Sequence, residues 1–194
     1  MVFQLSLVPH HGGFDRLGMG RHVSYPAFHR HVQSDCPHHT YQNRFDQVLD
    51  LQGGERMKLV YSYYVLDIVH KGHLLMMKNS KAIAGEDGKL IVGILTDEAV
   101  MEKKSKPILS FEDRMELASA IKYVDVVVAQ ETYSPMPNVV RIKPDVLMES
   151  SSHSEEAIKE AREYMEGIGG RVIVIPYYPA ESSTHIKNEI KNRS

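Results

Sequence analysis

Two histidines in the segment His70-Lys71-Gly72-His73 are, by type and spacing, the side chains best placed to do chemistry. They follow the apolar, β-branched run 58–69 and open a helical pattern. Three residues apart on the first turn of a helix, the two imidazoles face the same small volume. The free N–H groups and the positive end of the helix dipole already favour an anion there. The sequence therefore predicts a site that stabilises developing negative charge on a phosphate.

Two metal-binding interpretations stand beside this one. His70 and His73 could ligate a metal ion, although Asp67 is the only further ligand nearby. A second candidate set lies near the N-terminus and consists of His29, His31, Cys36, His38 and His39. Its spacing matches no established zinc pattern. The histidine motif alone does not decide between these interpretations, so support must come from the rest of the chain.

Composition narrows the class of protein. A length of 194 residues suits one domain of ordinary size. Because 23 Lys and Arg balance 25 Asp and Glu, a nucleic-acid binder that relies on a basic face is disfavoured. No apolar run approaches the roughly 20 residues that cross a membrane, and no signal peptide pattern opens the chain. We therefore expect a cytoplasmic protein whose partners are neither nucleic acid nor membrane.

The composition changes at Met57. Residues 1–56 contain no lysine and show no sustained strand or helix period, so we expect a poorly structured leader there and a functional domain over 57–194. The stretch 53–56, Gly-Gly-Glu-Arg, can be encoded by a purine-rich sequence that resembles a bacterial ribosome-binding site. We hypothesise that translation starts at Met57 and that the leader is not part of the native protein. An intact mass that includes residues 1–56 would refute this hypothesis.

From Met57 onward, short apolar segments alternate with helical ones. The predicted strands are Leu59–Val65, Leu90–Leu95, Val124–Val128, Asp145–Met148 and Val172–Ile175. The predicted helices run from Gly72 to Gly85, over Phe111–Ile121 after Ser110, from Ser154 to Gly167, and over Thr184–Lys191 after Ser182 or Ser183. Near-continuous apolar strands are typical of parallel sheets. We predict an α/β fold, a Rossmann-like, doubly wound, parallel five-stranded sheet with helices on both faces.

Three motifs in this order resemble the cytidylyltransferase family of the HxGH nucleotidyltransferases. They are His70–His73 after the first strand, Ser110–Arg114 at a helix start and Ser182–Lys187 at the last helix. The resemblance covers about residues 57–191. It is strongest to the cytidylyltransferase domains of phosphonate biosynthesis, through Gly93–Ala99, Lys106–Arg114, Gln130–Thr132 and Arg141–Asp145. Glycerol-phosphate and choline-phosphate cytidylyltransferases are similar but more distant.

The resemblance implies transfer of CMP from CTP to a small phosphonate or phosphorylated alcohol, with release of pyrophosphate. His70 and His73 would hold the α-phosphate, and Lys104, with Lys103 as its local competitor, would bridge acceptor and α-phosphate. Arg114 would meet the β- or γ-phosphate, while Ser183 and Thr184 would donate to the triphosphate. Mg²⁺ is implied as the counter-ion of the triphosphate. The segment 122–127 is similar to one that pairs subunits in this family, so a homodimer is implied.

Some segments depart from the family pattern. Tyr63 stands where relatives have a small glycine, and Val65 replaces a small polar residue. Ser150–His153 replaces an acidic segment, and Tyr178–Glu181 lacks the usual arginine and glycine. These departures leave two alternatives open: an adenylyltransferase of the same superfamily, or a catalytically impaired nucleotide-binding regulatory protein.

Overall fold

The computed structural model describes residues 57–176 and 182–193. The predicted leader, the candidate metal ligands around Cys36 and the segment Tyr178–Glu181 lie outside these residues. Among the residues that are described, no helix is both long enough and apolar enough to cross a bilayer.

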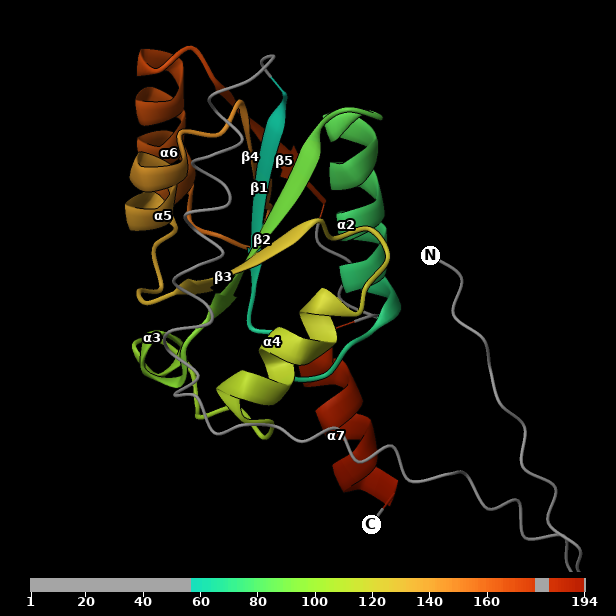
Figure 1. Ribbon diagram of the computed structural model, residues 1–194. Helices are drawn as coiled ribbons and strands as arrows, with labels where there is room; N and C mark the ends of the chain where they lie inside the picture. The colour runs from blue at the N-terminus through green and yellow to red at the C-terminus, as the bar shows by residue number, and fades with distance from the viewer. Residues whose placement is uncertain (1–56, 177–181, 194) are drawn as a thin grey trace, which may run out of the picture. The chain divides into compact units, whose positions relative to one another are not determined.

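Five parallel strands form one sheet in the spatial order β3-β2-β1-β4-β5 (Figure 1). The strands are β1 (Leu59–Tyr64), β2 (Lys89–Leu95), β3 (Val126–Gln130), β4 (Val146–Ser150) and β5 (Arg171–Ile175). The chain builds outward from β1 to β3 and then returns to the other side of β1 with β4. The strand order therefore reverses between β1 and β4, as it does in a doubly wound sheet. The predicted fold class is confirmed.

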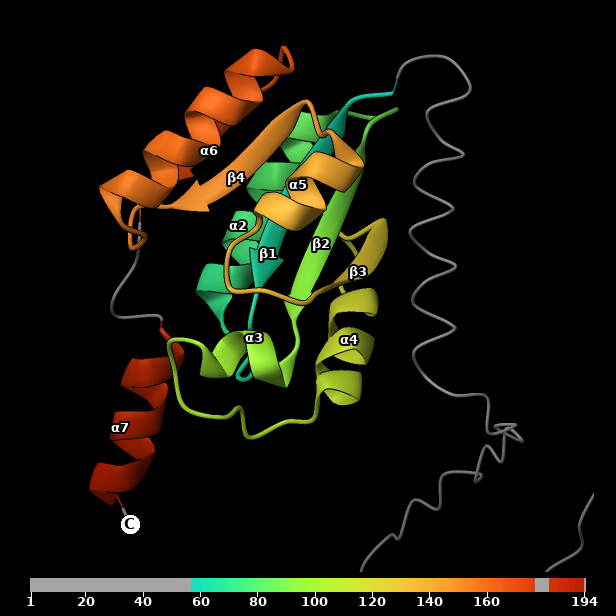
Figure 2. The same ribbon diagram turned by 90° about the vertical axis from the view of Figure 1, so that its left-hand side faces the viewer.

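Helices cover both faces of the sheet (Figures 1 and 2). They are α2 (Lys71–Ala84), α3 (Asp97–Met101), α4 (Phe111–Ser119), α5 (Met136–Ile142), α6 (Glu155–Gly167) and α7 (Ser183–Arg193). Because side chains alternate along a strand, Val60 and Tyr64 of β1 pack with α2 and α4, while Leu59 and Tyr61 pack with α5 and α6. Two apolar cores thus hold the central strand from both sides.

Side-chain caps fix where several helices begin. Ser110 accepts the N–H of Asp113 at 3.1 Å and donates its own hydroxyl to the Asp113 carboxylate, so Ser110 caps α4, as its place before the predicted helix indicates. Ser154 accepts the N–H of Ala157 at the start of α6, as its position predicts. Ser182 accepts the N–H of His185 at 3.2 Å, so Ser182 is the serine whose side chain caps α7.

Two local features differ from the sequence-based prediction. The third strand begins at Val126, because the Asp125 carboxylate turns back to accept the Leu90 N–H at 2.7 Å. Two short helices, α3 and α5, were not predicted. Thr96 caps α3 through the N–H of Ala99, and Pro135 precedes α5. Neither helix is long enough for an apolar period to be legible in the sequence.

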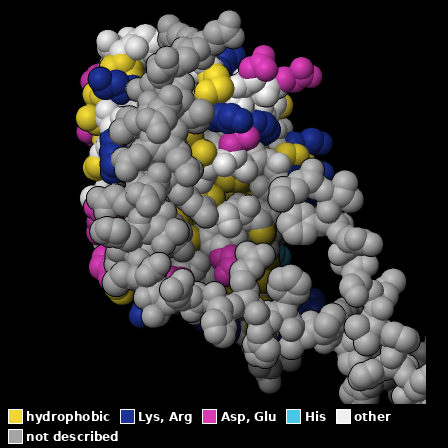
Figure 3. All heavy atoms as spheres, viewed as in Figure 1, with side chains coloured by type: hydrophobic (Ala, Val, Ile, Leu, Met, Phe, Trp, Pro, Cys, Tyr) yellow, Lys and Arg dark blue, Asp and Glu magenta, His cyan; other side chains and the backbone are white. Residues whose placement is uncertain are grey.

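Charged side chains of both signs are intermixed where the described surface is visible in Figure 3. This mixture agrees with the balance of acidic and basic residues in the sequence.

Candidate active site

A pocket of about 720 Å³ opens at the C-terminal ends of the parallel strands. The ends of β1, β2, β4 and β5 line it together with the start of α2, the loop after α3, and α7. An open parallel sheet binds its ligands at this edge, next to the point where the strand order reverses. Among the described residues that line the pocket, the charged side chains apart from histidine are Lys104, Lys187, Lys191 and a single acid, Asp67. The lining thus suits a polyanion.

The two histidines lie together at the start of α2. The His70 carbonyl accepts the N–H of His73 at 3.0 Å, which sets the first turn of the helix. The two rings stack with centroids 3.8 Å apart, and the Tyr64 ring meets His73 edge-on at 5.6 Å. Both imidazoles line the pocket. The structure therefore brings them to one volume, as their spacing predicts.

His73 is held as a neutral imidazole. Burial, and after it the charge of the neighbouring His70, lowers the pKa of His73 from 6.5 to about 3. Its Nδ1 atom is buried and has no hydrogen-bond partner among the described residues. A neutral imidazole carries one N–H and can donate it to an oxyanion without bringing a charge of its own.

Helix α7 brings its N-terminal turn to the same pocket. Ser182, Ser183 and Thr184 all line the pocket, as the resemblance implies for the last two. The Ser183 hydroxyl donates to the carbonyl of Ile68 at 3.2 Å, which ties α7 to the turn between β1 and α2. Lys187, one turn further along α7, also lines the pocket. Sequence reasoning quoted Lys187 within its motif but gave it no role.

The loop after α3 settles which of two neighbouring lysines faces the pocket. Lys104 lines it, whereas Lys103 is not among the lining residues. Both ammonium groups lie near the Tyr133 ring, with Nζ 5.8 Å from its centroid for Lys104 and 4.8 Å for Lys103. Of the two lysines, Lys104 is therefore the one that lines the pocket.

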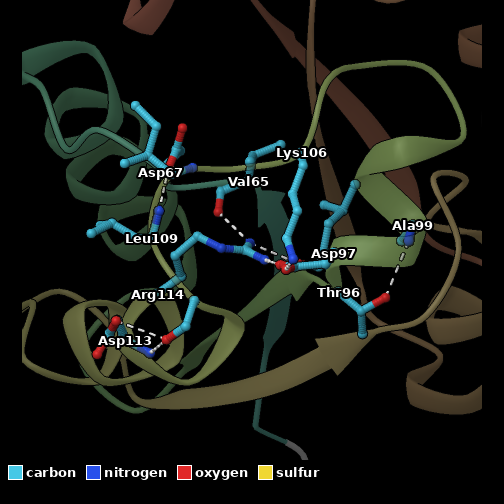
Figure 4. Close-up of polar contacts among 12 residues, drawn as sticks. Val65, Asp67, Thr96, Asp97, Ala99, Lys106, Leu109, Asp113 and Arg114 are labelled. Carbon is cyan, nitrogen blue, oxygen red and sulfur yellow. Dashed lines mark hydrogen bonds and ion pairs between the residues drawn. The ribbon is translucent and has the colours of Figure 1, made fainter.

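Arg114 is not brought to the pocket. Its side chain is 0% exposed, and its guanidinium donates to the carbonyls of Val65 and Leu95, each at 2.7 Å (Figure 4). It also donates to Asp97 at 2.6 Å, and Asp97 in turn lies 3.7 Å from the Lys106 ammonium. The resemblance implies that this guanidinium meets a phosphate, but its described partners are groups of the protein interior. Arg114 holds the ends of β1 and β2 in place.

The turn after β1 is under strain, and Arg114 helps to fix it. Leu66 is fully buried and adopts the left-handed region with φ of 61°, which a branched side chain rarely occupies. Arg114 donates a hydrogen bond to the carbonyl of Val65, the residue immediately before Leu66. The strained turn directs the next side chain, Asp67, toward the loop before α4 and toward α7.

Asp67 is 6% exposed and accepts three hydrogen bonds. Its Oδ1 accepts the N–H groups of Ile108 at 2.7 Å and Leu109 at 2.9 Å (Figure 4 labels Asp67 and Leu109). Its Oδ2 accepts the Lys187 ammonium at 2.6 Å. Burial would raise the pKa of Asp67, but Lys187 and the two backbone donors outweigh it and lower that pKa below its ordinary value. Asp67 is therefore an anion whose oxygens are already engaged, which disfavours its role as a metal ligand.

Two residues from the segments that depart from the family pattern, Tyr63 and His153, meet at one wall of the pocket. The Tyr63 hydroxyl lies 3.0 and 3.1 Å from the two carboxylate oxygens of Glu149, and His153 Nδ1 lies 2.5 Å from one of them. The Tyr63 and His153 rings stack at 5.5 Å. Burial, and then the Glu149 charge, raises the pKa of Tyr63, so its hydroxyl stays protonated. Sequence reasoning noted Tyr63 and His153 but missed Glu149, which is buried and joins them.

Fold and site together define a nucleotidyltransferase of the α/β class, with a histidine pair after the first strand and a capped last helix around one pocket. The chain belongs to the cytidylyltransferase-like family, whose model matches residues 65–189.

Curated relatives agree with this assignment. An FAD synthase of Korarchaeum cryptofilum is 30% identical over 142 residues, which are 72% of this chain and 94% of the relative. The bifunctional protein HldE of Alcanivorax borkumensis is 30% identical over 142 residues, 72% of this chain and 29% of the relative. The HldE of Gluconobacter oxydans is 28% identical over 131 residues, 66% of this chain and 26% of the relative. The chain thus spans about a quarter to a third of the length of these HldE relatives.

Solved structures share the fold. The lipopolysaccharide core biosynthesis protein of Thermoplasma volcanium superposes with a TM-score of 0.53 at 26% identity, covering 63% of this chain and 98% of that one. A macrolide-efflux protein of Streptococcus pneumoniae superposes with a TM-score of 0.52 at 15% identity, covering 71% and 53%. The second match is a likeness of fold alone.

Proposed function

We propose that the domain over residues 57–194 transfers a nucleotidyl group from a nucleoside triphosphate to a small phosphonate or phosphorylated alcohol and releases pyrophosphate. One observation carries the proposal. The histidine pair, the N-terminus of α7 and three lysines line a single pocket whose only described acid, Asp67, is already paired. Such a lining favours three linked phosphates and offers neutral donors where charge develops.

In the proposed reaction, an acceptor oxygen attacks the α-phosphorus in line, and the bond from that phosphorus to the bridging oxygen of the β-phosphate breaks. Pyrophosphate leaves with the electron pair of that bond. His70 and His73 hold the α-phosphate oxygens, and Lys104 bridges the acceptor and the α-phosphate. Ser183 and Thr184 donate to the remaining phosphates from the start of α7. This chemistry depends on position and charge neutralisation more than on covalent catalysis.

Mg²⁺ is proposed as the counter-ion that enters with the triphosphate and neutralises part of its charge. The described residues contain no group of three or more His, Cys, Asp or Glu side chains that could hold a metal ion. The donor set fits an ion that is bound mainly through phosphate oxygens and water, as Mg²⁺ often is.

We propose CTP as the nucleotide, because four segments resemble the cytidylyltransferase domains of phosphonate biosynthesis: Gly93–Ala99, Lys106–Arg114, Gln130–Thr132 and Arg141–Asp145. Pyrophosphate release with Mg²⁺ tests this when each of the four nucleoside triphosphates is paired with 2-aminoethylphosphonate, phosphocholine and glycerol 3-phosphate. We expect release with CTP and at least one of these acceptors. Measurable nucleotide binding with no release from any pair would instead support a nucleotide-binding regulatory protein.

Adenylyl transfer is the second candidate. The observation that favours it is the similarity to an FAD synthase, since FAD contains an adenylyl group. The wall of Tyr63, Glu149 and His153 departs from the cytidylyltransferase pattern, so a preference for ATP over CTP is compatible with it. Adding flavin mononucleotide, the half of FAD that lacks the adenylyl group, to the acceptor panel separates the two candidates. Release with ATP and none with CTP would overturn the cytidylyl assignment.

A homodimer through the segment 122–127 is also proposed. Leu117, which is exposed, lies near the C-terminal end of α4, next in the chain to this segment, and would be covered by a second copy at this side. Light scattering on the purified protein should give twice the mass of one chain. A single-chain mass across the micromolar range would contradict this proposal.

A further inference from the structure

Three segments that are far apart in the sequence are joined by the Asp67 carboxylate. Asp67 itself lies on the turn that leads into the histidine pair. Its Oδ1 binds the backbone of Ile108 and Leu109, 41 and 42 residues later, and its Oδ2 binds Lys187, 120 residues later. Its side chain is 5% exposed, so these contacts are largely shielded from water.

Each joined segment brings a different group to the pocket. The loop over residues 102–110 carries Lys104, and α7 carries Ser183 and Thr184. Lys106, between Lys104 and Ile108 in this loop, has a separate contact. Its ammonium lies 3.7 Å from the Asp97 carboxylate, which also binds Arg114. Among the described contacts, Asp67 connects Ile108 and Leu109 of this loop to Lys187 of α7.

We propose that Asp67 is a positioning residue that couples the loop over residues 102–110 to α7, so that Lys104 and the N-terminal turn of α7 take their places together. The proposal rests on the proposed function for its consequence in catalysis, but the coupling itself is a property of the unliganded protein. Asp67 acts through other groups in this scheme, because its two carboxylate oxygens are engaged by Ile108, Leu109 and Lys187.

The physical basis is the cost of an unmatched buried group. Replacing Asp67 with Asn keeps an oxygen for the two backbone N–H groups but removes the charge that holds Lys187. Replacing Lys187 with Met removes the other half of the same ion pair and touches neither Ile108 nor Leu109. If the pair couples the two segments, both substitutions loosen the loop, although Lys187 makes no described contact with it.

The chain offers a matched control at the opposite edge of the sheet. Asp125 also accepts one backbone N–H, from Leu90 at 2.7 Å, and the Lys81 ammonium at 2.7 Å, while the Lys89 ammonium lies 3.8 Å from its other oxygen. It shares the chemistry of Asp67 and lies outside the pocket lining. Lys191 is the second control, because it lies one turn after Lys187 on α7 and lines the pocket without a described ion pair.

The test is limited tryptic digestion of the full chain without nucleotide, with cleavage after Lys103 and Lys104 followed by mass spectrometry. We expect Asp67→Asn and Lys187→Met each to raise this cleavage rate about tenfold, and the double variant to add little to either. Asp125→Asn and Lys191→Met should leave it near the wild-type rate, even though Asp125→Asn lowers the melting temperature. An unchanged rate for Lys187→Met, or an equal rise for Asp125→Asn, would overturn the coupling.

Kinetics give the catalytic consequence separately. In the enzyme, Asp67→Asn should lower kcat/KM for the triphosphate on the order of 10- to 100-fold. Asp67→Glu, which keeps the charge, should recover part of that loss. A full loss of coupling in the digestion with normal kcat/KM would refute the catalytic consequence. If no triphosphate supports turnover, the proposed function fails while the digestion still decides the coupling.

Discussion

The two edges of the parallel sheet use the same carboxylate chemistry for different ends. At the N-terminal edge, Asp125 accepts the Leu90 N–H and Asp145 accepts the Leu59 N–H at 2.8 Å, which joins adjacent strands. At the C-terminal edge, Asp67 and Glu149 bind groups that belong to the pocket wall. The first edge completes the fold. The second edge positions side chains that line the pocket.

The difference appears in the buried nitrogens. Among the described residues, His73 Nδ1 and Arg114 Nε are buried without a hydrogen-bond partner, and both belong to side chains at the C-terminal edge. Unmatched buried polar atoms are costly and concentrate where function requires them. Both edges thus carry stabilising carboxylate contacts, but the C-terminal edge also keeps an unmatched buried atom on a side chain that lines the pocket, His73.

Replacing a histidine at the C-terminal edge is expected to have the largest effect. His73→Ala should lower kcat on the order of 10²–10³-fold, because one donor to the developing charge is lost. The melting temperature should change little, since His73 already carries an unmatched atom. His185→Ala, an exposed histidine of α7 outside the pocket lining, is the control. Equal turnover in the two variants would remove the histidine pair from the mechanism.

The same histidine predicts how stability depends on pH. Because its pKa falls from 6.5 to about 3 on folding, the unfolded chain binds a proton between these values that the folded chain does not. The part of the free energy of unfolding that comes from neutral His73 should therefore be complete above pH 6.5. It should decrease as the pH falls toward 3, by up to about 1.4 kcal/mol per pH unit. Urea unfolding at pH 4.5 and 6.5 measures this slope. His73→Ala should flatten it, whereas an unchanged slope would assign the dependence to other groups.

A substitution in the middle of the sheet, between the two edges, should change the free energy of unfolding. A Cβ atom at Gly93 of β2 would lie 2.1 Å from the Tyr61 hydroxyl oxygen, so Gly93→Ala should lower the free energy of unfolding by about 1–3 kcal/mol. Gly167→Ala is the matched control, because no atom lies within 4 Å of its added Cβ. Thermal unfolding of both variants checks the prediction. A neutral Gly93→Ala would show that Tyr61 can move aside.

The smallest expected effect separates two tyrosines on one face of β1. Tyr61 donates to Gln130 in a buried neutral network, whereas Tyr63 binds Glu149 at the pocket. Tyr63→Phe should change the ratio of kcat/KM for CTP over ATP by less than about tenfold, because one hydrogen bond at the wall is lost. Tyr61→Phe should lower the melting temperature and leave that ratio unchanged. Equal ratios in both variants would exclude the Tyr63 wall from nucleotide selection.

Much of the fold follows from the sequence. The five apolar runs predict the strands to within two residues at their starts, because strands buried on both faces need near-continuous apolar side chains. The caps at Ser110 and Ser154 are hydrogen bonds between residues three apart in the chain, so the local sequence predicts them.

The site was only partly predictable. His70 and His73 were predicted from their local spacing, and the structure brings their rings together. Arg114 could not be placed from sequence, because burial against the ends of β1 and β2 depends on contacts 19 and 49 residues away. Glu149 was missed for the same reason, since its partner Tyr63 lies 86 residues earlier. Motif order finds the elements of a site but not which side chains face the ligand.

The long separation between Asp67 and Lys187 also has a consequence for how the molecule is made. The central strand β1 can pair with β2 early, but its other neighbour, β4, is synthesised some 86 residues after it, and Lys187 follows 120 residues after Asp67. A contact cannot form before both of its partners have left the ribosome. Lys187 therefore follows all five strands in the order of synthesis, and the contact that ties α7 to the turn after β1 can form only once every strand of the sheet has been made.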